Sequence, residues 1–106
     1  MEEELIIKIN KLNKYITNKK DIDTFKDVLE KGCSNKDYYY NQIEIKNKES
    51  MEIEKAINSI ENSNERNILI KKYMLNQTFK DIAECLGYCE QQVKRIHKKA
   101  LYNICI

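Results

Sequence analysis

A chain of 106 residues with no proline and only two glycines has few places at which a tight turn can form. Folds made of many short strands need a turn at each reversal of the chain, and proline and glycine are the residue types that most often form such turns. The length allows one hydrophobic core but not two independent ones. We therefore predict an all-α protein and exclude a β-sandwich, a β-barrel and a multidomain enzyme.

Residues 1–64 are predicted to be a helical region that builds the core. Near the N-terminus, one apolar stripe repeats at helical spacing and consists of Leu5, Ile9, Leu12 and Ile16. A second apolar stretch begins near Ile22 and ends at Gly32, a residue type that often terminates helices. The stripe lapses around Asn18, so the sequence leaves open whether the two stretches form one bent helix or two.

Residues 38–46 are ambiguous between a helix and a strand, because their tyrosines and isoleucines also suit a strand. We favour a helix, since no other segment alternates apolar and polar residues as a partner strand would. A helix also gives a coiled-coil-like seam, which consists of Tyr39, Ile43, Lys46, Ser50, Ile53, Ile57 and Ile60. The seams at Leu5–Ile16 and Ile53–Ile60 are candidate dimer surfaces, unless a monomeric core buries both. A polar break is expected at Glu61–Asn64.

Residues 65–106 have the pattern of a helix-turn-helix DNA-binding region. Thr78 is a candidate N-cap, and Asp81 lies in the first turn, where the helix dipole favours negative charge. Gly87 can adopt the left-handed conformation that ends a short helix, and Cys89 occupies the cap position of a final helix over about 90–103. The predicted helix-turn-helix core consists of Ile82, Ala83, Leu86, Gly87, Tyr88, Val93 and Ile96.

Positive charge collects in this C-terminal region. Residues 65–106 contain eight basic and four acidic side chains, whereas residues 1–64 contain 11 and 13. On a helical projection, the face opposite Val93 contains no acid and presents Gln91, Arg95, Lys98, Lys99 and Tyr102. Double-stranded DNA suits such a face, because amides and guanidinium groups read base edges and ammonium groups neutralise phosphates. The candidate base contacts are Gln91, Gln92 and Arg95; the candidate phosphate contacts are Thr78, Lys80, Lys94, Lys98 and Lys99.

About the last 40 residues resemble a known family. The matching segments are 65–73, 76–88 and 92–101, and they are similar to region 4 of sigma-70-type transcription factors. More narrowly, they resemble the small sigma-region-4-like regulators of phages and prophages of low-GC Gram-positive bacteria. The resemblance implies transcriptional regulation, with RNA polymerase as a further candidate partner. Two positions depart from the family pattern: Asn76 replaces a glycine, and Cys89 replaces a serine or threonine cap.

One short recognition helix makes few base contacts, so we expect a homodimer that binds two half-sites. Two other functions stay open: a small terminase-like subunit for DNA packaging, and an adaptor whose basic helix binds RNA polymerase or a sigma factor. No nucleophile has a credible base beside it and no Gly-rich phosphate loop is present, so no enzyme is predicted. His97 is assigned to packing, and the cysteine spacing disfavours a zinc site, so we expect neither a metal nor a cofactor.

The N-terminus begins with Met-Glu-Glu-Glu, whereas a signal peptide begins with basic residues, and its apolar run is interrupted by Lys8. Four cysteines in a chain without such a signal are expected to be reduced thiols. We therefore expect a cytoplasmic protein of a bacterial cell, of host or phage origin, with no membrane partner.

Overall fold

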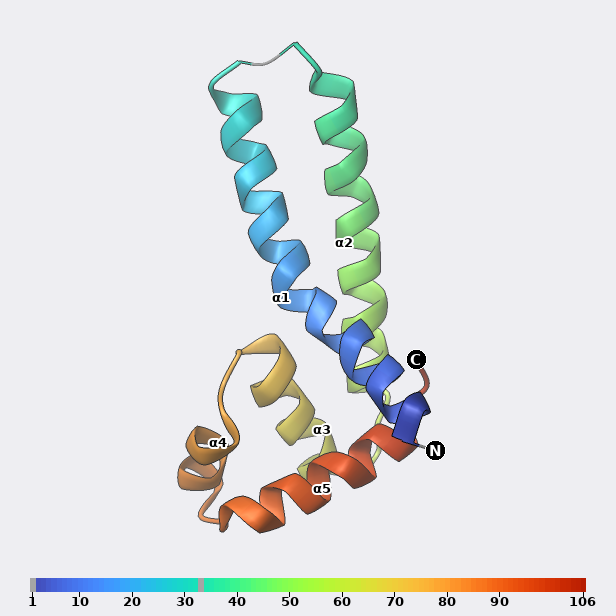
Figure 1. The fold of residues 1–106 in the computed structure, drawn as a ribbon, viewed down its shortest axis with the longest axis vertical. Coiled ribbons are helices and arrows are strands. Elements are labelled where there is room, and N and C mark those ends of the chain that lie inside the picture. Colours follow the sequence, from blue (N-terminus) through green and yellow to red (C-terminus); the bar gives the residue numbers. More distant parts are fainter. Residues whose placement is uncertain (1, 33) are drawn as a thin grey trace.

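The computed structural model describes residues 2–32 and 34–106, and every regular element in these ranges is a helix. The order along the chain is α1 (Glu2–Glu30), α2 (Lys36–Asn58), α3 (Ser63–Leu69), the short π-helix η1 (Ile70–Met74), α4 (Phe79–Leu86) and α5 (Glu90–Asn103). The molecule is elongated, 51 × 27 × 23 Å, with a long α1–α2 hairpin above a base of short helices (Figure 1). The prediction of an all-α fold is confirmed, and residues 38–46 lie within α2.

Helix α1 is continuous over 29 residues, which settles the question that the sequence left open. The apolar stripe lapses at Asn18, but the helix does not break there, because Asn18 is buried and its amide donates a 3.5 Å hydrogen bond to Glu49 on α2. The buried face of α1 continues from Tyr15 through Asn18 to Ile22. The buried face of α1 therefore continues past the polar residue, at helical spacing.

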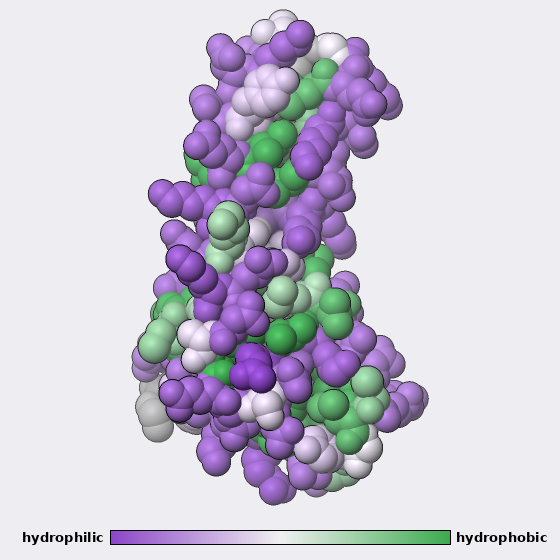
Figure 2. All heavy atoms as spheres, turned by 180° about the vertical axis from the view of Figure 1, so that it is seen from behind, coloured by the Kyte–Doolittle hydropathy of each residue, from purple (hydrophilic) through white to green (hydrophobic). Residues whose placement is uncertain are grey.

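Polar contacts alternate with apolar ones along the hairpin. The Tyr15 hydroxyl donates to Glu54 at 2.5 Å, and Lys46 pairs with Asp21 at 3.1 Å. Nearer the tip, the rings of Phe25 and Tyr39 lie 5.4 Å apart. Seen from behind, a strip of apolar side chains lies between the two helices of the upper hairpin, among hydrophilic neighbours (Figure 2). No third helix among the described elements is drawn against this upper part (Figure 1).

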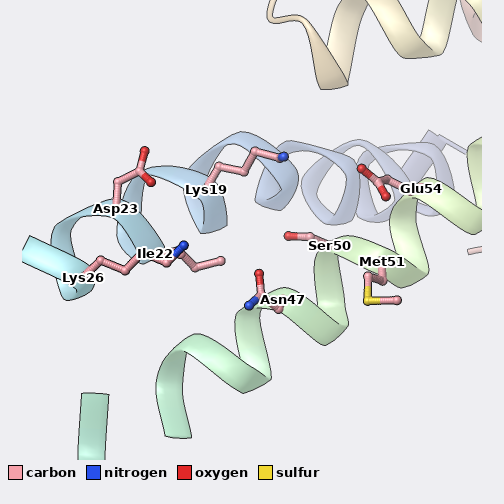
Figure 3. A pocket seen from close by; sticks show the side chains of 8 residues that line it. All are labelled: Lys19, Ile22, Asp23, Lys26, Asn47, Ser50, Met51 and Glu54. Atoms are coloured by element: carbon pink, nitrogen blue, oxygen red, sulfur yellow. The ribbon is translucent and has the colours of Figure 1, made fainter. Parts of the chain in front are cut away.

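A groove lies between α1 and α2 on the hairpin, and Figure 3 shows its lining from close by. It is formed by α1 and α2 and is lined by Lys19, Ile22, Asp23, Lys26, Asn47, Ser50, Met51 and Glu54. Ser50 is buried, and its hydroxyl oxygen has no hydrogen-bond partner. The groove therefore contains one buried polar atom whose hydrogen-bonding capacity is unused.

The main core lies where the hairpin meets the base. Helices α1, α2, η1 and α5 all contribute to it, and its buried members include Leu5, Leu12, Ile53, Ile57, Ile60, Leu69, Tyr73, Ala100, Leu101 and Ile104. Both seams considered for dimerisation are thus used within one chain, because burying them internally removes their apolar surface from water. The amine of Lys8 also joins the base, donating to the carbonyls of Leu101 and Ile104 at 2.9 and 3.0 Å.

The third helix begins slightly earlier than expected. The predicted break at Glu61–Asn64 ends at Asn62, whose side-chain oxygen accepts a 3.1 Å hydrogen bond from the backbone N–H of Glu65. This bond satisfies one of the free donors at the start of a helix, and the helix therefore starts at Ser63. None of the described helices combines the length and the apolar character needed to cross a bilayer.

Candidate nucleic-acid interface

Helices α4 and α5 are joined by a turn of three residues, and local interactions fix both of its ends. The Thr78 hydroxyl accepts a 3.1 Å hydrogen bond from the Asp81 backbone N–H and caps α4. Gly87 ends α4 with φ of +72°, and the N–H of Tyr88 donates to the Ala83 carbonyl at 3.0 Å. This left-handed termination reverses the chain within a few residues. Helix α5 then spans Glu90–Asn103, which coincides with the predicted range.

A small apolar cluster holds the two helices together. Ile82, Ala83 and Val93 are buried in it, together with Ile68 of α3. Leu86, Tyr88, Ile96 and Phe79 are partly buried against this cluster, and Gly87 is exposed in the turn. Six of the seven predicted core positions therefore pack together. The seventh, Gly87, contributes its left-handed backbone conformation to the turn instead.

The two departures from the family pattern have visible structural consequences. Asn76 lies in the turn before α4 with φ of 57°, in the left-handed region that asparagine tolerates better than most residues. Cys89 occupies the N-cap of α5, but its side chain makes no capping hydrogen bond. The N-terminus of α5 therefore lacks the side-chain hydrogen bond that α4 receives from Thr78.

The exposed face of α5 carries the amide and basic side chains. Val93, His97, Ala100 and Leu101 are its buried residues. All the candidate contact residues are exposed, those of α5 and the two near the start of α4: Gln91, Gln92, Lys94, Arg95, Lys98, Lys99, Thr78 and Lys80. In Figure 1, α5 lies across the end of the molecule opposite the hairpin tip. The hairpin therefore does not cover this face.

The basic side chains of α5 are not neutralised within the described part of the chain. The single ion pair found there joins Lys46 to Asp21 on the hairpin, and no carboxylate lies within salt-bridge distance of Arg95, Lys98 or Lys99. Unpaired cations on one face raise the local positive potential and attract polyanions. Residues 2–32 and 34–106 hold no cluster of histidine, cysteine and acidic side chains that could bind a metal ion.

His97 forms a buried contact that sequence reasoning identified only as packing. Its Nε2 atom and the Tyr73 hydroxyl share a 2.6 Å hydrogen bond, and the Phe79 ring lies edge-on to the imidazole at 5.0 Å. Burial lowers the pKa of His97 to about 4, helped by the nearby charge of Lys72. Burial also raises the pKa of Tyr73 to about 12. Both groups are therefore uncharged at neutral pH.

Two lysines lie close to the ring of Phe79, beside the His97–Tyr73 pair, and the sequence did not predict this grouping. The ammonium nitrogen of Lys72 on η1 lies 4.6 Å from the centre of the Phe79 ring, and that of Lys94 on α5 lies 5.9 Å from it. The three residues are on three different elements and are separated by seven and fifteen positions. No local spacing rule links them, and only the packing of η1, α4 and α5 brings them together.

Comparison with protein-family models, with curated proteins and with solved structures finds no match to this chain.

Proposed function

We propose that this protein is a sequence-specific DNA-binding transcriptional regulator of the phage or prophage type. In this proposal α4 and α5 act as a helix-turn-helix, and α5 enters the major groove of double-stranded DNA. The observation that carries the proposal is the division of α5 into two faces. One face is buried against the core, and the other exposes Gln91, Arg95, Lys98 and Lys99 with no carboxylate paired to them.

The proposed roles follow from side-chain chemistry. Arg95 is proposed to bond guanine with its two-pronged guanidinium group, and Gln91 and Gln92 are proposed to pair with adenine. A second set is proposed to contact phosphates and fix the orientation on the duplex: Thr78, Lys80, Lys94, Lys98 and Lys99. Support comes from their exposure around one end of the molecule.

The assignment to transcription rests on the resemblance of the C-terminal residues to region 4 of sigma-70-type factors. RNA polymerase is therefore a proposed second partner. We also propose that two copies bind as a homodimer, because one 14-residue helix reads few base pairs. Since the seams in the core are occupied, such a dimer would have to use another surface.

Three experiments test this function. Selection of bound duplexes from a randomised pool should return a defined sequence, and light scattering of the complex should give two copies for each site. Affinity for the selected duplex should fall steeply as salt is added, because phosphate contacts release counterions. Random recovered sequences with no salt dependence would contradict DNA binding and favour the adaptor. A ring-shaped oligomer on a packaging site would favour the terminase-like alternative.

A further inference from the structure

The two lysines that share the Phe79 ring lie at the edge of the proposed DNA-binding face. Lys72 and Lys94 both lie within cation–π distance of one aromatic ring, so their ammonium groups are no farther apart than the sum of the two distances given above. That sum is about one Debye length at 0.1 M salt, so salt does not fully screen the repulsion between the two ammonium groups.

Neither ammonium group forms a salt bridge within the described residues. Neither lysine has a carboxylate within 4 Å, and the neighbouring His97 is a neutral, buried imidazole at physiological pH. The partly buried ring of Phe79 is the group that attracts both cations, through the negative face of its π system. Two cations beside one ring, neither of them paired with a carboxylate, raise the local positive potential and attract an external anion.

We propose that Lys72 and Lys94, held against the Phe79 ring, form a phosphate-binding pair that grips the DNA backbone beside the groove entered by α5. This inference rests on the proposed function and extends it. Lys72 adds η1 to the contact surface, which the sequence had confined to α4 and α5. Phe79 is a positioning residue, because it contacts the two lysines and touches no phosphate.

The experiment measures the affinity of the full-length protein for its selected duplex by fluorescence anisotropy over a range of salt concentrations. Lys72→Ala and Lys94→Ala should each lower the slope of log affinity against log salt by about 1. At 0.1 M salt each should weaken binding by up to roughly eightfold, equally for the selected duplex and for an unrelated one. Lys20→Ala is the matched control, because Lys20, like Lys94, is an exposed helical lysine but lies on the hairpin.

Phe79→Leu tests the positioning role, since leucine retains an apolar side chain and lacks the aromatic face. It should weaken binding in the wild-type background and have no further effect in the Lys72→Ala/Lys94→Ala double variant. A ring that acts only through the fold would weaken binding in both backgrounds, and this result would overturn its positioning role.

The results distinguish failure of the phosphate-binding pair from failure of the proposed DNA-binding function. If the wild-type protein binds duplex DNA with a steep salt dependence and both lysine variants behave like Lys20→Ala, the phosphate pair is wrong and the proposed function stands. If the wild-type protein binds no duplex at any salt concentration, both are wrong.

Discussion

Tyr73 of η1 and His97 of α5 share a buried hydrogen bond of 2.6 Å, and their rings are stacked with centres 5.6 Å apart. Tyr73 belongs to the main core, and His97 also contacts Phe79 of the smaller apolar cluster. The pair therefore links the packing of the hairpin base to the packing of α4 and α5.

This pair predicts that the protein loses stability in acid. The pKa of His97 is about 4 in the folded protein and 6.5 in an unfolded chain, so the unfolded state binds the proton more readily. The free energy of unfolding contributed by His97 is fully present above pH 6.5 and is lost as the pH falls towards 4. The loss should amount to about 3 kcal/mol, measured by urea unfolding at a series of pH values.

His97→Gln is the control for this prediction, because glutamine keeps a hydrogen-bonding side chain and does not titrate in this range. The variant should show a smaller change in stability between pH 6.5 and 4. An equal change in the two proteins would assign acid sensitivity to other groups.

Tyr73 predicts a loss of stability at alkaline pH. Because its pKa is raised to about 12, the free energy of unfolding should fall as the pH rises from 10 to 12.

The caps of α4 and α5 predict opposite effects of two substitutions. Thr78→Ala removes the acceptor of the Asp81 N–H and should lower stability by about 1 kcal/mol. Cys89→Ser introduces a hydroxyl at an N-cap whose present side chain makes no bond, and should raise stability by up to about 1 kcal/mol. Thermal unfolding followed by circular dichroism measures both, and an equal loss for both variants would contradict the capping assignments.

Ser50→Ala should leave the protein as stable as the wild type or make it more stable by about 1 kcal/mol. The buried hydroxyl has no partner, so its removal relieves a desolvation cost, and alanine is the better helix former. Ser59→Ala provides the comparison, because the Ser59 hydroxyl donates to the Ala56 carbonyl at 2.7 Å. If Ser50→Ala destabilises the protein by more than Ser59→Ala does in urea unfolding, the Ser50 hydroxyl makes a stabilising interaction and is not unpaired.

Arg95 is proposed to contact a base and Lys98 a phosphate, so their substitution should weaken DNA binding in different ways. Arg95→Ala should cost ~1–3 kcal/mol on the selected duplex and relax the preference at one base pair. Lys98→Ala should weaken all sequences alike and lower the salt slope by about 1. Binding to a panel of single-base variants of the site distinguishes the two patterns. Unchanged affinity in both variants would show that the assigned face of α5 is not the DNA contact.

Much of the fold was accessible from the sequence because local chemistry determines it. The bounds of α5, the left-handed turn at Gly87 and the Thr78 cap depend on residues within one or two helical turns. The unbroken course of α1 was not accessible, because the burial of Asn18 depends on Glu49 of the opposing helix. The contact of Lys72 and Lys94 with one ring likewise depends on three elements packing together.

For the candidate interface, the sequence indicated which side chains of α5 face outward, because a helical projection needs only the spacing of apolar residues. Their exposure in the structure agrees with that projection. The buried partner of His97 could not be predicted in the same way, since Tyr73 lies 24 positions away on η1.

The amine of Lys8 binds the carbonyls of Leu101 and Ile104, where α5 has no basic side chain in its own last turn. A cation at the end of a helix satisfies free carbonyls and opposes the negative end of the dipole. Lys8, near the N-terminus of the chain, therefore stabilises the C-terminal end of α5. Deletion of the first ten residues would remove Lys8 and leave the last turn of α5 frayed.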